Sequence, residues 1–141
     1  YVVALQFAVK RDEYQQFFLQ GRRGSAIVGN AEGYPDSPGV LFIKWLGVGS
    51  RYRRHGYGTE MVRELERLAQ GWGYHSIALS VNDRRSAAFW EAMGYTWRQG
   101  DEPRRRLKRL EDLDLVPNSP AAGPPVPREL RVFWPGRPLE P

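Results

Sequence analysis

The chain has 141 residues, of which 41% are apolar and 26% are charged, and it contains no cysteine. This length favours one compact domain over residues 1–141, because two cores of half the size would each be marginal. The mean hydropathy is -0.58, and no apolar run reaches the ~20 residues that a bilayer crossing needs, which excludes a transmembrane helix and predicts no membrane partner.

The absence of cysteine excludes disulfides, thiolate nucleophiles and zinc-thiolate sites. His55 and His75 are the two histidines, so a metal centre would depend on carboxylates, and we expect no metal. The lack of disulfides and of a signal-like segment favours a cytoplasmic protein. The net charge of +5 attracts a phosphorylated cofactor, an acidic partner or a nucleic acid, and does not choose among them.

The first forty residues mix short apolar segments with turn-forming residues. Residues 1–9 are apolar and β-prone, and residues 11–20 predict a short helix with Tyr14, Phe17 and Phe18 on one side. Residues 25–29 predict a small strand. Residues 30–39 carry the glycine and proline punctuation of a turn or hairpin loop.

The middle of the chain has the strongest periodicities. Residues 40–48 form a nearly continuous apolar run, as in a strand buried on both faces, and residues 59–70 have the helical spacing of apolar side chains. Residues 77–81 predict a second buried strand. Asp83 caps a second helix that ends at Gly94. The order strand, helix, strand implies a right-handed crossover between two parallel strands.

Beyond residue 94 the pattern is weaker. Residues 95–98 predict the start of another strand, and Pro103 opens a short basic helix that carries the arginines of residues 104–109. A proline-rich excursion at 118–127 precedes a final strand that is predicted at 130–134.

One segment combines glycines with arginines where the strand at 40–48 leads into the helix at 59–70. Gly56 and Gly58 allow a tight turn and close approach of the backbone to a ligand, while the free N–H groups and dipole of the helix favour an anion. Arg53 and Arg54 add fork-shaped donors. A pyrophosphate would suit this arrangement, although glycines between a strand and a helix are also ordinary loop chemistry. The spacing is neither the dinucleotide-fold fingerprint nor a P-loop.

Two motifs together resemble the GCN5-related N-acetyltransferase (GNAT) superfamily. Its acyl-CoA-binding pattern, (Gln/Arg)-x-x-Gly-x-(Gly/Ala), is matched by Arg53, Gly56 and Gly58. Residues 88–95 are similar to its second signature, which has an aromatic pair, a glutamate and a glycine followed by Phe or Tyr. The resemblance covers about residues 40–98, and the preceding 39 residues look short for the family's opening strand and two helices.

The resemblance implies an α/β fold of the GNAT type, with a mixed sheet whose parallel central strands splay apart to admit CoA and with helices flanking the sheet. Leu46, Gly47 and Val48 would border the thioester and pantetheine. The pyrophosphate cradle would consist of Arg53, Arg54, His55, Gly56, Tyr57, Gly58 and Thr59. The far wall would consist of Asn82, Ser86, Phe89 and Trp90.

The resemblance also implies a reaction in which an amine attacks the thioester directly, with a backbone N–H near Leu46 stabilising the oxyanion. Two positions depart from the family. The tyrosine that often protonates the thiolate is replaced by Trp90, and the strand position that often carries a carboxylate base is Trp45. Tyr95, Tyr57, Glu32 and Asp83 are the alternative proton carriers, and an ordered water could replace the base. Trp45, Trp90 and Tyr95 equally suit packing roles, and Asp83 a helix cap.

These observations favour an N-acyltransferase that uses acetyl-CoA, or another acyl-CoA, as cosubstrate and a small-molecule or protein amine as acceptor. Two alternatives from other classes remain. A non-catalytic acyl-CoA-binding domain would explain the loss of both usual proton carriers, and a nucleic-acid module would use the basic segment at 104–109. A homodimer paired through edge strands is a further option.

Overall fold

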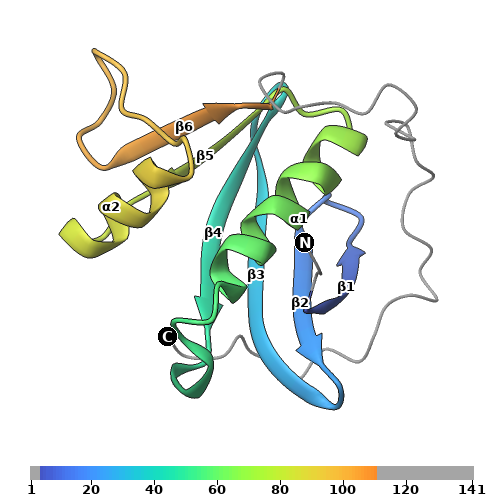
Figure 1. The fold of residues 1–141 in the computed structure, drawn as a ribbon. Helices are drawn as coiled ribbons and strands as arrows, with labels where there is room; N and C mark the ends of the chain where they lie inside the picture. Colours follow the sequence, from blue (N-terminus) through green and yellow to red (C-terminus); the bar gives the residue numbers. More distant parts are fainter. Residues whose placement is uncertain (1–3, 111–141) are drawn as a thin grey trace.

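The computed structural model describes residues 4–110 (Figure 1). Their elements, in chain order, are β1 (Gln6–Arg11), β2 (Phe17–Arg23), β3 (Ala26–Ser37), β4 (Val40–Val48), the 3-10 turn η1 (Ser50–Tyr52), α1 (Tyr57–Gly71), β5 (Ser76–Ser80), α2 (Arg84–Ala92) and β6 (Arg105–Arg109).

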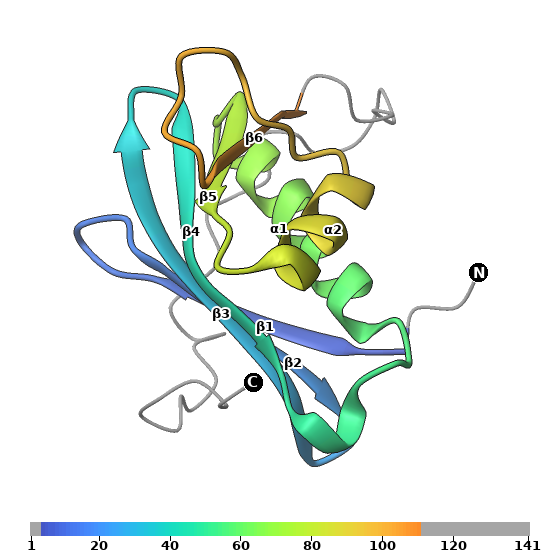
Figure 2. The same ribbon diagram turned by 90° about the vertical axis from the view of Figure 1, so that its left-hand side faces the viewer.

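The six strands form one sheet in the order β1-β2-β3-β4-β5-β6. All neighbouring strands pair antiparallel except β4 and β5, which are parallel and are connected through α1. Parallel neighbours require such a crossover, because a tight hairpin reverses the chain direction. Both helices lie on the same face of the sheet (Figure 2). The prediction of a mixed α/β sheet with a parallel pair and flanking helices is therefore confirmed.

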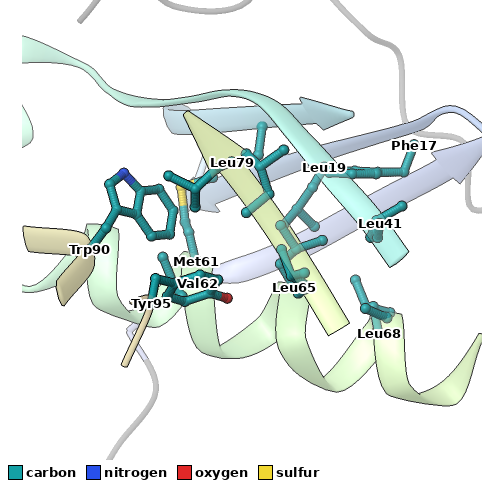
Figure 3. Close-up of a cluster of buried hydrophobic side chains, with 14 of the residues drawn as sticks. Phe17, Leu19, Leu41, Met61, Val62, Leu65, Leu68, Leu79, Trp90 and Tyr95 are labelled. Carbon is teal, nitrogen blue, oxygen red and sulfur yellow. The ribbon is translucent and has the colours of Figure 1, made fainter. Parts of the chain in front are cut away.

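The core lies between α1 and the sheet. Met61, Val62 and Leu65 have helical spacing and are 0% exposed, and they pack with Phe17 and Leu19 of β2 (Figure 3). Burial of such a stripe stabilises a helix that would be marginal alone. The packing fixes α1, and therefore its N-terminus, relative to β4 and β5.

The central predictions agree with these elements. The strand predicted at 40–48 is β4, the helix predicted at 59–70 is α1, and the strand predicted at 77–81 is β5 with a shift of one residue. Asp83 caps α2, because its Oδ1 accepts a hydrogen bond of 2.7 Å from the backbone N–H of Ser86.

The helix predicted at 11–20 is wrong, since residues 12–16 form the turn between β1 and β2 and residues 17–20 belong to β2. The Asp12 carboxylate accepts hydrogen bonds of 2.9 Å from the N–H groups of Tyr14 and Gln16, and Gln15 has a left-handed φ of 64°. A side chain that binds the backbone two residues on favours a turn over a helix. Phe17 then enters the helix-facing side of β2.

The loop predicted at 30–39 is also wrong, because β3 continues to Ser37. A Cβ on Gly33 would overlap the carbonyl oxygen of Phe42 and the ring of Phe17. This glycine therefore permits close packing within the sheet rather than a turn. The reversal between β3 and β4 occurs near Gly39, which has a φ of 78°.

The basic helix predicted after Pro103 is replaced by the strand β6, in which Leu107 pairs with Ala78 of β5. Arg105 forms an ion pair of 3.0 Å with Asp36, and Arg106 one of 3.0 Å with Glu91. The strand predicted at 95–98 is reduced to a single bridge between Thr96 and Leu107. The excursion at 118–127 and the strand predicted at 130–134 lie outside the described residues.

Candidate functional site

A β-bulge in β4 opens the sheet between β4 and β5. Glu32 of β3 pairs with Trp45, whereas the next residue, Gly33, pairs with Ile43, so Lys44 is an extra residue in β4. Bulges bend the strand that carries them and increase its twist. The pairing of β4 with β5 ends at the preceding residue, where Ile43 lies opposite Leu79. Beyond this point the two strands diverge toward their carboxyl ends (Figure 1).

The diverging strands enclose a cavity of about 290 Å³. It is lined by Ile43, Lys44, Trp45, Leu46, Leu79, Ser80, Asn82, Asp83, Ser86 and Trp90. The sequence placed Leu46, Asn82, Ser86 and Trp90 around such a cleft, and the structure brings these four together. It missed Lys44 and Ser80, whose signal was their position at the carboxyl ends of two parallel strands.

The backbone of β4 directs donor and acceptor groups to the side on which this cleft lies. The N–H of Gly49 donates a hydrogen bond of 2.8 Å to the carbonyl of Val28. This bond shows which residues of β4 direct their backbone groups toward β3. Because bonded and non-bonded pairs alternate along an antiparallel ladder, the N–H and C=O groups of Leu46 and Val48 point away from β3 and toward β5. Within residues 4–110, β5 no longer pairs with β4 at this level.

The backbone of β5, on the other side of the cleft, alternates in the same way. Val81 donates a hydrogen bond of 2.8 Å to the carbonyl of Arg104, on the β6 side. The backbone groups of Ser80 therefore point toward β4. Two strands thus face one another across the cleft with backbone donors and acceptors that a ligand with amide groups can satisfy.

The first turn of α1 offers a second set of backbone donors at the end of β4. Gly56 precedes the helix with a φ of 79°, and no side-chain hydrogen bond from the described residues caps it. The N–H groups of Tyr57, Gly58 and Thr59 lie in the first helical turn, where intrahelical partners are lacking and the dipole favours an anion. Open space surrounds Gly56, since a Cβ there would meet nothing within 4 Å.

Neighbouring side chains connect this turn to the cleft. Nε of Arg53 donates to the carbonyl of Val48 at 3.4 Å, and Arg54 and His55 are exposed beside Gly56. A Cβ on Gly58 would lie 3.6 Å from the ring of Phe89, so α2 packs closely against the first turn of α1. Phe89 thus packs between α2 and the first turn of α1, and it is not among the residues that line the cavity.

The hydroxyl of Tyr57 lies outside the cleft. Its side chain is 5% exposed and belongs to the core, and the hydroxyl accepts a hydrogen bond of 2.7 Å from Arg23. The alternative in which Tyr57 carries a proton to the thioester is therefore corrected, because the hydroxyl points away from the cleft toward β2.

Tyr95 requires a similar correction. It is 0% exposed, does not line the cavity, and its hydroxyl donates a hydrogen bond of 2.8 Å to Glu66 of α1. Burial raises the pKa of Tyr95 well above its usual value, and the adjacent Glu66 carboxylate raises it further. Lys108 lies 3.0 Å from the same carboxylate. Tyr95 therefore lies between α1 and β6. Its ring packs edge-on against the ring of Trp90, with 5.1 Å between the two ring centroids.

The remaining candidate proton carriers lie at or near the cleft. Trp90 is 8% exposed and lines the cavity. Asp83 also lines it, but its carboxylate is engaged as the cap of α2. Glu32 lies on β3 opposite Trp45, its side chain is 19% exposed, and Lys44 approaches it at 3.6 Å.

Two findings concern other kinds of site. Within residues 4–110, no group of three or more histidine or carboxylate side chains is placed to hold a metal ion. Neither α1 nor α2 is long and apolar enough to cross a membrane.

Comparison with known proteins supports this interpretation of the fold. The model of the Acetyltransferase (GNAT) family matches residues 2–95. No curated protein sequence matches the chain. Solved structures with the same fold include a Bacillus subtilis acetyltransferase in complex with CoA, with a TM-score of 0.62 and 12% identity over 74% of this chain and 98% of that chain.

Two further structures extend the comparison. The Escherichia coli N-acetyltransferase YhbS in complex with CoA has a TM-score of 0.56 and 16% identity over 67% of this chain and 58% of that chain. The AtaT–AtaR complex bound to DNA has a TM-score of 0.61 and 11% identity over 68% of each chain. Together with the family match, the bulged β4, the open β4–β5 cleft and the N-terminus of α1 show that the chain belongs to the GNAT acetyltransferase family.

Proposed function

We propose that the protein is an N-acyltransferase that transfers an acetyl group from acetyl-CoA to a primary amine. The observation that carries this proposal is the cleft beyond Ile43 and Leu79, which Leu46 lines and toward which the backbone groups of Leu46 point. The family match supports acyl transfer at the level of the family, and the substrates named here are our inference.

The residues of this chain fit CoA at two places. The N–H groups of Tyr57, Gly58 and Thr59 would bind the diphosphate, with the exposed guanidinium groups of Arg53 and Arg54 beside it. The amide groups of the pantetheine arm would pair with the backbone of Val48 and Ser80 across the cleft. Asn82 and Ser86 add polar side chains on the α2 wall.

The acyl transfer requires no nucleophile from the protein. The amine nitrogen attacks the thioester carbonyl, a C–N bond forms, and the C–S bond breaks. The N–H of Leu46 points into the cleft, where it would donate to the developing oxyanion, and one such donor contributes about 3 kcal/mol in comparable sites. Leu46 therefore acts through its backbone, so a side-chain substitution alone would leave this donor in place.

Proton transfer is assigned to Glu32 and to solvent. An amine must lose a proton to attack, and Glu32 is a carboxylate on β3 that pairs with Trp45, a residue that lines the cleft. It would accept that proton directly or through one water. The departing thiolate would leave as an anion or take a proton from water, because the indole N–H of Trp90 is too weak an acid to supply one.

A non-catalytic acyl-CoA-binding domain is the second candidate. The observation that favours it is the environment of the tyrosines, since the hydroxyls of Tyr57 and Tyr95 are both bound to other side chains and neither faces the cleft. This candidate predicts that CoA binds and that no amine is acetylated. The nucleic-acid alternative relied on a basic helix at 104–109; this segment contains the strand β6, in which Arg105 and Arg106 form ion pairs with Asp36 and Glu91.

The experiment is a calorimetric titration with acetyl-CoA followed by a thiol-release assay over a panel of primary amines. Binding together with amine-dependent release of CoA supports the enzyme. Binding without release from any amine favours the non-catalytic domain. Failure to bind either acetyl-CoA or CoA would contradict both candidates.

A further inference from the structure

A second groove lies at the end of the molecule away from the β4–β5 cleft. Its volume is about 360 Å³, and it lies between the hairpin that joins β3 to β4 and the segment that follows α1. The proposed diphosphate site is at the N-terminal end of α1, so the two sites lie at opposite ends of this helix. The apolar and neutral polar side chains of the groove include Pro35, Pro38, Trp72, Tyr74, Gln15 and Ser37.

Both aromatic rings of the groove are held in place by other side chains. The guanidinium carbon of Arg11 lies 4.3 Å from the centroid of the Trp72 ring, and the centroid of the Phe17 ring lies 6.2 Å from it. The hydroxyl of Tyr74 donates a hydrogen bond of 3.4 Å to Oε1 of Gln15. Because these walls are already ordered, a ligand that binds between them pays little to order them.

The chemistry of the groove suits a proline-rich peptide. Asp36 is the one charged side chain among the described residues that line it, and its carboxylate forms an ion pair of 3.0 Å with Arg105. The rest of the lining therefore selects by shape and hydrogen bonding. Extended prolines are ordered before they bind, pack against aromatic rings and keep their carbonyls available as acceptors. The side-chain amide of Gln15 is a donor for such a carbonyl.

The amino-acid sequence contains such a peptide. Five of the residues at 117–127 are prolines, and they are most closely spaced at Pro124, Pro125 and Pro127. An extended proline helix has three residues per turn, so Pro124 and Pro127 share one side of it. Two prolines on one side can contact the two aromatic rings together.

The described part of the chain ends next to the groove. The N–H of Leu110 donates a hydrogen bond of 2.7 Å to the carbonyl of His75, and its carbonyl accepts one of 3.1 Å from Nε2 of Gln70. His75 directly follows the groove residue Tyr74, and β6 ends beside the last turn of α1 (Figure 1). Thirteen residues separate Leu110 from Pro124. A chain of that length spans up to about 45 Å, which is ample for a return to the groove.

We propose that residues 124–127 of this chain bind in the groove between the β3–β4 hairpin and the end of α1. Pro124 and Pro127 would pack against the rings of Trp72 and Tyr74. The covalent connection favours this occupant over a free peptide, because a tethered segment acts at an effective concentration on the order of 1 mM. The inference does not depend on the proposed acyl transfer, since the segment would bind away from the acetyl-CoA cleft.

The absence of cysteine from the chain allows a direct test by disulfide formation. One cysteine replaces Ser37, an exposed residue that lines the groove, and the other replaces Val126. The matched control combines Val126→Cys with Ser50→Cys, at an exposed serine beyond the opposite end of β4. In dilute protein under mild oxidation, we expect the Ser37→Cys pair to form its intramolecular disulfide about tenfold faster or more than the control pair. Peptide mapping by mass spectrometry identifies the bond.

A second variant separates binding of the prolines from the effect of the tether. Pro124→Ser and Pro127→Ser are added to the Ser37→Cys/Val126→Cys protein, and neither replacement alters the described residues of the groove. We expect the rate of disulfide formation to fall to that of the control pair, because serine does not supply the ring that packs against Trp72 or Tyr74.

Three results would overturn the inference. Equal rates in the two cysteine pairs would show that the segment does not favour the groove. An unchanged rate after both prolines are replaced would show that the tether alone brings the cysteines together. A disulfide that joins two copies of the chain in dilute protein would show that the groove takes this segment from a second molecule instead.

Discussion

Substitution of Gly56 by valine tests the phosphate-binding role of the turn before α1. Gly56 has a φ of 79°, which a β-branched residue adopts at a cost of about 1–2 kcal/mol. Apart from the residues next to it in the chain, the new Cβ would meet no atom within 4 Å, so the branched side chain would occupy the space assigned to the diphosphate. We expect the affinity for acetyl-CoA to fall at least tenfold, which corresponds to about 1.4 kcal/mol.

The control for this prediction is Gly73→Val, at the other end of α1. Gly73 also has a positive φ, of 97°, and a Cβ there would also meet nothing within 4 Å. Both variants should lower the Tm by about 3–8 °C through backbone strain, and Gly56→Val alone should lose affinity in a calorimetric titration with acetyl-CoA. Equal affinities in the two variants would refute the assignment of the diphosphate to this turn.

The other predictions concern proton transfer and the buried tyrosine. Glu32→Gln should lower kcat by about 100-fold or more without changing the Kd for acetyl-CoA. The control Glu13→Gln, at an exposed position, should leave kcat unchanged. An unchanged kcat in Glu32→Gln would exclude Glu32 as the base. Trp90→Tyr should raise kcat by up to about 100-fold if departure of the thiolate is slow, because a phenol donates a proton that an indole does not, and stopped-flow thiol release measures this. For Tyr95, the pKa is raised in the folded state, so its contribution to stability is complete below pH 10 and is lost as the pH rises above that value, where the unfolded tyrosine ionises first. Denaturant melts between about pH 9 and pH 11 should therefore show a steeper loss in the wild type than in Tyr95→Phe, and parallel curves would contradict the buried environment.

The sequence was most informative where local periodicity and burial agree. β4 is apolar at every position except Lys44 because it lies in the middle of the sheet, and the apolar stripe of α1 faces a single layer of strands. The motif around Gly56 was also predictable, since its glycines and arginines act within a few residues of one another. These features depend on neighbours in sequence, and therefore a single sequence reveals them.

The wrong predictions share a different origin. Phe17 and Phe18 have a spacing that suits a helix, yet they lie on opposite faces of β2 because the Asp12 carboxylate closes a turn just before them. The arginines after Pro103 lie on a strand because β5 offers an open edge, and Asp36 and Glu91 pair with two of them from distant parts of the chain. The pairing of β6 with β5 and the two ion pairs join residues far apart in the chain, so no local sequence pattern indicates them.

The residues of the candidate site were predictable in part, and their geometry was not. Leu46 and Trp90 were expected at the cleft and lie there, while Tyr57 and Tyr95 were assigned to proton transfer and are bound by Arg23 and Glu66. The bulge at Lys44 decides where the sheet opens, and it is visible only from the register of β3 against β4.

A crystal structure of the protein with acetyl-CoA tests the central claim most directly. We predict that the diphosphate accepts hydrogen bonds from the first-turn N–H groups of α1, and that the thioester carbonyl accepts one from the N–H of Leu46 within the β4–β5 cleft. Acetyl-CoA bound elsewhere on the molecule, with β4 and β5 closed against each other beyond Ile43, would contradict the account.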